Sequence, residues 1–289
     1  MKLVRFGPPM QERPGVWLEG ALGPGQAGLL DVRAMAFDLE DYDSHFFAHW
    51  GLDRLRGLLA EKKRVILPAE GQRLGPPIAR PGKIICLGKN YRDHVAEFDA
   101  QLPDRPILFA KAATALIGPN DIIRIPADAE VDVEVELAVV IGKAAQNISE
   151  SEAMACVAGY TVLNDVTDRK AQRLDGQWFR AKSRDTFCPL GPFLVTADEI
   201  PDPYALRLYS KIHGQGIQDA RASDMIFKIA QLIAYASAAM TLEPGDVLST
   251  GTPGGIGSAR TPPVLLRPGD EVEVGVEGIG TQRNRVESA

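Results

Sequence analysis

Short runs of β-branched and apolar residues follow one another along most of the chain after residue 82. Gly, Pro, Asn or Asp bounds each run, which is the pattern of strands separated by turns. This pattern predicts strands in the segments KIICLG, ELAVVIG, VAGYTVLND, PFLVT, LRLYSKIHG and EVEVGVEGIG. One helix is predicted to interrupt them over residues 223–240, with Ser223 and Asp224 as its N-terminal caps.

The first part of the chain has a different pattern. It contains the short strand-like pieces KLVRF and GLLDV, followed by an acidic, aromatic stretch, DLEDYDSHFFAHW. An amphipathic helix is predicted by four leucines at helical spacing: Leu52, Leu55, Leu58 and Leu59. The Gly- and Pro-rich segment 71–83 indicates a linker. We therefore expect an α+β protein, mainly β, with a small N-terminal region over 1–75 and a larger domain over 76–289.

The composition is that of a globular protein from a reducing compartment. Hydrophobic residues make up 45% and charged residues 24% of the 289 residues, as in proteins that bury a core. The net charge of −6 excludes the basic excess of a nucleic-acid-binding protein. The three cysteines lie far apart and form no disulfide or zinc pattern. Because no segment has the pattern of a membrane span or a signal peptide, we expect a cytoplasmic protein that contacts no membrane.

The stretch VDVEVELAVVIG, residues 131–142, carries the most informative polar pattern. Side chains alternate between the faces of a strand, so Asp132, Glu134 and Glu136 are predicted to share one face. The apolar run after them is typical of a strand buried on both faces, where carboxylates repel each other and lose hydration. A hard divalent cation relieves both effects, although an ordinary acidic edge strand fits the same pattern. Asp165, which ends the following strand, is likewise either a ligand or a turn residue.

Seven successive segments resemble the fumarylacetoacetate hydrolase superfamily: KIICLGKNYRDHVAE, VEVELAVVIGK, VAGYTVLNDVTDRKAQ, AKSRDTFCPLGPFLVT, SDMIF, MTLEPGDVLSTGTPGGIG and LRPGDEVEVGVEGIGTQRN. They extend from Lys83 to Asn284, and residues 1–75 resemble the variable N-terminal region of bacterial members. The resemblance implies a mixed β-sandwich or β-roll for the catalytic domain, 76–289, and a homodimer. It also implies one Mg²⁺ or Mn²⁺ ion per subunit, with Ca²⁺ as an alternative occupant in crystals.

The resemblance assigns roles to nine residues. The family's metal ligands fall on Glu134, Glu136 and Asp165, its H-x-x-E pair on His94 and Glu97, its catalytic lysine on Lys182, and its substrate-binding residues on Arg169, Gln172 and Thr252. Several of these residues also have an ordinary interpretation. Without the family motifs, His94 would be a surface or partly buried histidine and Lys182 a surface lysine. Arg169 and Gln172 would belong to a solvated helix face. Ile212-His213-Gly214 stands where relatives often have Val-Asn-Gly, and we expect a hairpin turn there rather than a catalytic histidine.

Together these residues imply chemistry on a small 2-oxo or 2,4-dioxo acid. Such an acid chelates a divalent ion, which then acts as a Lewis acid. With Glu97 orienting its imidazole, His94 would activate water, and Lys182 would stabilise developing negative charge. The expected reaction is hydrolysis of a C–C bond in an acylpyruvate, fumarylpyruvate or diketo-deoxy sugar acid, giving pyruvate and a carboxylic acid. The alternatives are oxaloacetate decarboxylation, 2-hydroxyhepta-2,4-diene-1,7-dioate isomerisation or decarboxylation, and a catalytically inactive binding protein.

Overall fold

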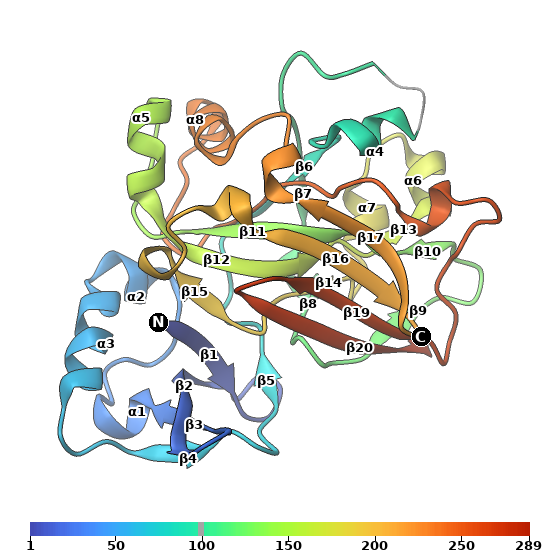
Figure 1. Ribbon diagram of the computed structural model, residues 1–289. Helices are drawn as coiled ribbons and strands as arrows, with labels where there is room; N and C mark the ends of the chain where they lie inside the picture. The colour runs from blue at the N-terminus through green and yellow to red at the C-terminus, as the bar shows by residue number, and fades with distance from the viewer. Residues whose placement is uncertain (98–100) are drawn as a thin grey trace.

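One long mixed sheet extends from the N-terminal region through the centre of the molecule (Figure 1). The structure, a computed structural model, describes residues 1–97 and 101–289. Within these residues the sheet has eleven strands, with β5 paired to β1 beside the main path. In spatial order the others are β4 (Ile66–Pro68), β3 (Gln26–Asp31), β2 (Arg13–Gly23), β1 (Lys2–Phe6), β15 (Leu194–Thr196), β12 (Val157–Asn164), β11 (Val135–Ile141), β18 (Val247–Ser249), β6 (Ile84–Gly88) and β7 (Ile107–Lys111); β5 covers Leu74–Gly75.

A second sheet of five strands packs against β11 and β12. Its strands, in spatial order, are β17 (Gln215–Arg221), β16 (Arg207–Ile212), β19 (Glu271–Val276), β20 (Gly280–Ser288) and β9 (Ile123–Ile125). Two short pairs complete the described strands: β10 (Val131–Asp132) with β13 (Thr167–Asp168), and β8 (Leu116–Ile117) with β14 (Cys188–Pro189). His213 lies in the turn between β16 and β17 with φ of 49°, so the predicted hairpin turn is confirmed.

Strand β11 is the centre of the core. Leu137 and Val139 belong to the apolar cluster that includes the second sheet, whereas Ala138 and Val140 belong to the cluster on the opposite face. All four residues are fully buried, and burial of each larger side chain contributes about 1.5–3 kcal/mol. Because both faces are covered, residues 137–141 of this strand are apolar without alternation, as the sequence predicted. The α+β, mainly β class is confirmed.

The helices lie at the edges of the sheets (Figure 1). They are α1 (Val32–Met35), α2 (Ser44–Ala48), α3 (Gly51–Ala60), α4 (Arg92–Ala96), α5 (Glu150–Ala153), α6 (Arg169–Asp175), α7 (Phe179–Lys182) and α8 (Ile229–Ala239). No helix in the described parts of the chain is both long and apolar enough to cross a membrane. The leucine-rich segment forms α3, as predicted, and Leu55 is its buried leucine.

Helix α8 starts later than the sequence predicted. Ser223 and Asp224 form a short 3-10 turn instead of capping it, and the helix begins at Ile229. The intervening residues are not helical, and the amides of Ile226 and Phe227 donate hydrogen bonds to the carbonyl oxygen and side chain of Asn90, at 2.7 and 2.8 Å. A tertiary contact therefore sets this boundary.

The N-terminal strands join the larger sheet directly. Lys2 and Leu3 of β1 pair with β15, which lies almost two hundred residues away along the chain. Segment 71–83, predicted as a linker between the two regions, packs against the rest of the protein, because β5 pairs with β1 and Ile78 is buried. Arg73 in this segment bridges Glu12 and Asp121 at 2.9 and 2.6 Å, tying the N-terminal region to the rest of the chain. The division at residue 75 stays a prediction.

Candidate active site

Three carboxylates from neighbouring strands meet in the interior. Glu134 precedes β11, Glu136 lies within it, and Asp165 directly follows its antiparallel neighbour β12. One oxygen of each carboxylate lies within 4.8 Å of the others, and all three residues are buried. The structure thus brings together the triad that the sequence singled out.

The strand that carries these carboxylates is interrupted, although Val131, Val133 and Val135 all belong to one apolar cluster, as the predicted alternation requires. β10 ends at Asp132 and β11 begins at Val135. Between them the amide of Glu134 donates a hydrogen bond to the side-chain oxygen of Asn164 at 3.2 Å. A side chain therefore takes the place that a backbone carbonyl oxygen has in a regular strand pair. Asp132 is not one of the three clustered carboxylates, but it lies beside Glu134, because Arg169 Nη2 donates to Asp132 Oδ2 at 3.0 Å and to Glu134 Oε1 at 2.6 Å.

Three buried cations surround the triad. Lys182, at the end of α7, donates to Glu134 Oε2 at 2.8 Å and to Asp165 Oδ2 at 2.5 Å. Lys111, at the end of β7, donates to the other oxygen of Asp165 at 2.6 Å. Arg169, at the start of α6, donates to Glu134 Oε1 at 2.6 Å. Lys182 and Arg169 are therefore interior residues, and neither the surface nor the solvated-helix alternative holds for them.

The charges around the triad act differently on its members. Burial raises the pKa of Glu134, but the positive charges of Lys182 and Arg169 outweigh burial and hold that pKa below its ordinary value. For Glu136, burial and the negative charges of Asp165 and Glu134 act together and raise the pKa well above its ordinary range. A divalent cation with oxygen ligands would supply the charge that favours ionised Glu136. The donor set and its electrostatics can therefore hold a divalent metal ion.

The H-x-x-E pair is built at the end of α4. His94 lies within this helix and Glu97 follows it, as the predicted helical spacing requires. His94 Nδ1 lies 3.2 Å from Glu97 Oε2, and the other carboxylate oxygen of Glu97 accepts a hydrogen bond from the amide of Gly255. Gly255 belongs to the Gly-rich loop of residues 250–258, TGTPGGIGS, which thereby positions the carboxylate that orients the imidazole.

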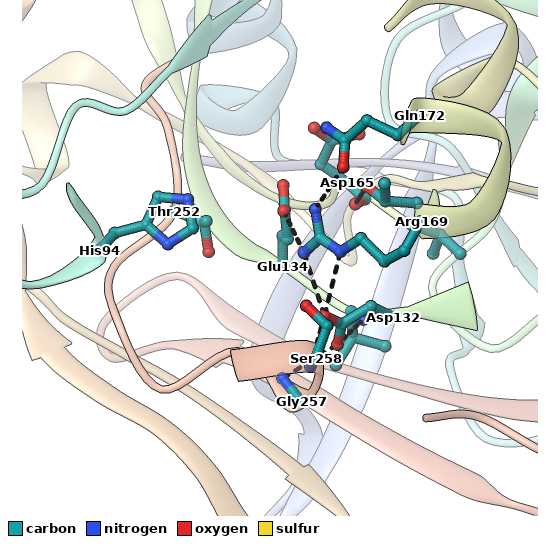
Figure 2. Close-up of polar contacts among 12 residues, drawn as sticks. His94, Asp132, Glu134, Asp165, Arg169, Gln172, Thr252, Gly257 and Ser258 are labelled. Carbon is teal, nitrogen blue, oxygen red and sulfur yellow. Dashed lines mark hydrogen bonds and ion pairs between the residues drawn. The ribbon is translucent and has the colours of Figure 1, made fainter. Parts of the chain in front are cut away.

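A cavity of about 330 Å³ connects these groups. Figure 2 shows His94 and Thr252 on one side of Glu134, and Arg169 with Gln172 on the other. The lining residues are Leu87, Gly88, Lys89, His94, Phe109, Glu134, Arg169, Gln172, Arg173, Trp178, Lys182 and Thr252. The nine residues selected from the sequence all belong to this region, since Glu136 and Asp165 complete the triad and Glu97 contacts His94.

Asp132 joins the Gly-rich loop to the cavity wall (Figure 2). Its two oxygens accept hydrogen bonds from the amides of Gly257 and Ser258 at 3.0 and 2.9 Å. Its Oδ2 also accepts a hydrogen bond from Arg169 at 3.0 Å. Because Arg169 contacts Glu134 as well, one carboxylate fixes both the loop and the arginine beside the triad.

Three further buried residues support the site, and the sequence analysis did not single them out. Lys111 contacts Asp165, as described above. Ser249 donates a hydrogen bond from its hydroxyl to Glu136. Gln218 Nε2 donates to the hydroxyl of Thr252 at 2.8 Å. Lys111 directly follows the apolar run ILFA, and a lysine at the end of such a strand could have indicated a residue of the site. Ser249 and Gln218 have no comparable local pattern.

The family described as fumarylacetoacetate (FAA) hydrolase, C-terminal, matches residues 83–287. The chain belongs to this family. The resemblance inferred from its motifs is confirmed, and the match covers all the residues of the candidate site.

Similar proteins from the fumarylacetoacetate hydrolase family match over the whole chain. Mitochondrial oxaloacetate tautomerase Fahd2a of Rattus norvegicus is 42% identical over 290 residues, which are 99% of this chain and 91% of the rat protein. Maleylpyruvate hydrolase from Sphingobium sp. SYK-6 has a TM-score of 0.82 at 29% identity, covering 100% of both chains. The isomerase of 2-hydroxyhepta-2,4-diene-1,7-dioate from Mycobacterium marinum has a TM-score of 0.76 at 34% identity, covering 100% of this chain and 98% of the other. The similar proteins thus include a hydrolase, an isomerase and a tautomerase.

Proposed function

We propose that the protein is a metal-dependent hydrolase that cleaves the C–C bond of a 2,4-dioxo acid, releasing pyruvate and a carboxylic acid. The observation that carries this proposal is the position of the His94–Glu97 pair on the same cavity as the carboxylate triad. An oriented imidazole can activate water there, and the triad can hold the ion that binds the 2-oxo acid end.

Glu134, Glu136 and Asp165 are proposed to hold Mg²⁺ or Mn²⁺, ions that suit buried carboxylate ligands. The bound ion would act as a Lewis acid toward the 2-oxo oxygen of the substrate. Arg169 and Gln172, which contact each other at 3.1 Å, would orient the substrate from the side of α6. Thr252 would contribute its hydroxyl from the Gly-rich loop that forms the opposite wall.

His94 is proposed as the general base. A hydrogen bond from Nδ1–H to Glu97 makes Nε2 the basic nitrogen, which accepts a proton as a water oxygen attacks the C4 carbonyl carbon. The C3–C4 bond then breaks with its electron pair moving to C3, where conjugation with the 2-oxo group spreads the negative charge. The ammonium of Lys182 stabilises this charge, and C3 takes up a proton to give pyruvate.

Keto–enol tautomerisation of oxaloacetate is the second candidate, favoured by the 42% identity to the rat tautomerase over 99% of this chain. This reaction moves a proton between C3 and the 2-oxo oxygen and needs no attacking water. The same base could perform it. An assay of acetylpyruvate cleavage beside enol–keto conversion of oxaloacetate, both with Mg²⁺, distinguishes the two. We expect pyruvate release from acetylpyruvate, and tautomerisation without any cleavage of 2,4-dioxo acids would replace the first proposal by the second.

The Gly-rich loop offers a test of how the base is positioned. Gly255 has φ of 93°, and a Cβ atom there would lie 2.6 Å from the carbonyl oxygen of Ile217. Gly255→Ala must therefore displace the amide that holds Glu97, at a cost in stability of about 1–3 kcal/mol. We expect kcat to fall by up to about 10²-fold, the effect of a misplaced catalytic group, while the protein still folds.

The matched control for this loop variant is Gly57→Ala in helix α3, where an added Cβ meets no atom within 4 Å. It should leave kcat unchanged and raise the thermal midpoint slightly, because Ala favours a helix more than Gly does. Wild-type kcat in Gly255→Ala would show that the Gly255–Glu97 contact does not support catalysis.

We also propose that the protein is a cytoplasmic homodimer whose catalytic domain begins after residue 75. Size-exclusion chromatography with light scattering at micromolar concentration should give twice the 31.3 kDa of one chain. A mass of one chain under these conditions would contradict the dimer.

A further inference from the structure

The backbone amides of the Gly-rich loop hold carboxylates that have three different roles in the site. The amides of Gly251, Gly255 and Gly257 donate hydrogen bonds to Glu136, Glu97 and Asp132, respectively. The first carboxylate belongs to the triad, the second contacts the imidazole of His94, and the third contacts Arg169. The position of the loop therefore affects the triad, the proposed base and the proposed substrate-binding arginine together.

Gly255, in the middle of the loop, is held through both of its backbone polar groups. Its amide binds Glu97, and its carbonyl oxygen accepts a hydrogen bond from Nε of Arg260 at 3.2 Å. Nη2 of the same guanidinium donates to the carbonyl oxygen of Ile217 at 2.5 Å. Ile217 lies in β17, an edge strand of the second sheet, where outward backbone groups have no strand partner. Arg260 thus fastens the loop to this sheet at the residue that holds Glu97.

Backbone carbonyl oxygens are the partners of the Arg260 side chain. A longer hydrogen bond, to Gly216 at 3.4 Å, joins those to Gly255 and Ile217, and no carboxylate within residues 1–97 and 101–289 forms an ion pair with Arg260. A planar guanidinium presents its donors in a rigid fork, so it can bridge two carbonyl oxygens at once. Arg260 is half-buried and is not one of the described residues that line the cavity. Any effect of Arg260 on the reaction must therefore pass through the loop.

We propose that Arg260 is a positioning residue, which holds the Gly255 amide against Glu97 and thereby keeps the imidazole of His94 in its reactive orientation. Without the guanidinium, the carbonyl oxygen of Gly255 loses its partner. Because glycine has access to more backbone conformations than any other residue, the amide of Gly255 then leaves Glu97 easily. This inference rests on the proposed function, in which His94 is the general base.

Arg260→Met should separate the base from the rest of the site. The loop keeps its contacts on either side of Gly255, because Gln218 donates to the carbonyl oxygen of Pro253 and the amide of Ser258 donates to Asp132, both at 2.9 Å. We expect kcat for acetylpyruvate to fall by about 10-fold, within the loss that a misplaced catalytic group causes. The KM should change by less than about two-fold, and the Kd values for Mn²⁺ and oxalate should be those of the wild type.

The tautomer of His94 provides a readout that does not depend on the reaction. A neutral imidazole that donates from Nδ1 to Glu97 carries its proton on Nδ1, and without this partner the proton moves mainly to Nε2. The ¹⁵N chemical shifts of the ring nitrogens distinguish the two forms, and His94→Ala assigns the signals among the four histidines of the chain. We expect the Nδ1–H form in the wild type and a larger share of the Nε2–H form in Arg260→Met.

Arg285→Met, a change of an exposed arginine in β20 of the same sheet, is the matched control and should keep the wild-type kcat and tautomer. Arg260→Lys can still bind one carbonyl oxygen, so it should lose less activity, and it carries the same test should Arg260→Met fail to fold.

An unchanged kcat or an unchanged His94 tautomer in Arg260→Met would overturn the proposal. A loss of Mn²⁺ affinity as large as the loss of kcat would also overturn it, because the whole loop would then have moved. The reaction is tested separately by pyruvate release from acetylpyruvate with the wild type. If the wild type released no pyruvate, the hydrolase would be refuted, and the tautomer shift alone would decide whether Arg260 positions His94.

Discussion

Removal of divalent metal with EDTA is expected to abolish cleavage of 2,4-dioxo acids, and Mg²⁺ or Mn²⁺ is expected to restore it. The physical reason is the buried triad of Glu134, Glu136 and Asp165, whose oxygens lie within 4.8 Å of one another. Without a metal ion, an anionic substrate would meet these carboxylates with no Lewis acid to bind its oxygens. The measurement is the initial rate before and after chelation, with metal content determined by elemental analysis. Full activity in a metal-free sample would refute metal dependence.

Glu136→Gln should separate metal binding from folding. Loss of a group that only hydrogen-bonds to a metal ligand already weakens a metal site by about 10–100-fold, so loss of a ligand itself should raise the Kd for Mn²⁺ by at least about 100-fold. In the metal-free protein the change removes a carboxylate whose pKa is raised by burial and by its acidic neighbours. The thermal midpoint of the metal-free variant should therefore equal or exceed that of the metal-free wild type.

The control for this substitution is Glu150→Gln, which changes an exposed glutamate at the start of α5. It should bind Mn²⁺ as the wild type does. Metal added at 100 times its Kd stabilises a folded protein by about 2.7 kcal/mol. At an Mn²⁺ concentration about 100 times the wild-type Kd, the wild type and the control should both gain this free energy of unfolding. Glu136→Gln should not gain it. An unchanged Mn²⁺ affinity in Glu136→Gln would remove this residue from the ligand set.

The parts of the fold that the sequence predicted well are those determined by local apolar pattern. Residues 137–141 of β11 are apolar on both faces because an apolar cluster covers each face, and this run indicates a strand without reference to the rest of the chain. The candidate site was found in the same way, through short motifs. His94 and Glu97 lie three residues apart, and Glu134 and Glu136 lie two residues apart. Local spacing along the chain therefore brings each pair together.

The features that the sequence did not predict depend on contacts between distant residues. Asn90 accepts a hydrogen bond from the amide of Phe227 before α8, 137 residues away, and no pattern near Ser223 indicates that contact. Asp132 binds loop amides 125 and 126 residues away, a contact that the strand pattern does not indicate. Lys111 pairs with Asp165 across 54 residues. In each case the two partners are far apart in the sequence and close only in the folded protein. The periodicity of residues along the chain therefore cannot predict the contact.

His94→Ala is expected to lower acetylpyruvate hydrolysis by about 10²–10⁴-fold, the usual contribution of a general base. The imidazole is held against Glu97 at 3.2 Å on the wall of the cavity, in a position to take a proton from water. Binding of metal and of oxalate, a pyruvate-like inhibitor, should persist, because the triad is intact in the variant. His49→Ala is the matched control, since His49 is exposed and stacks on His45 with ring centroids 4.1 Å apart. It should retain wild-type rates.

Oxaloacetate decarboxylation, measured on the same samples at the same Mg²⁺ concentration and pH, distinguishes water activation from other roles of His94. Decarboxylation needs stabilisation of negative charge at C3 but no attacking water, so His94→Ala should affect it less than hydrolysis. Unchanged hydrolysis in the variant would eliminate water activation. Equal loss of both activities, with oxalate binding retained, would assign His94 to a proton transfer shared by the two reactions, such as protonation of C3. That second result would favour oxaloacetate tautomerisation, in which the same proton transfer at C3 is the whole reaction.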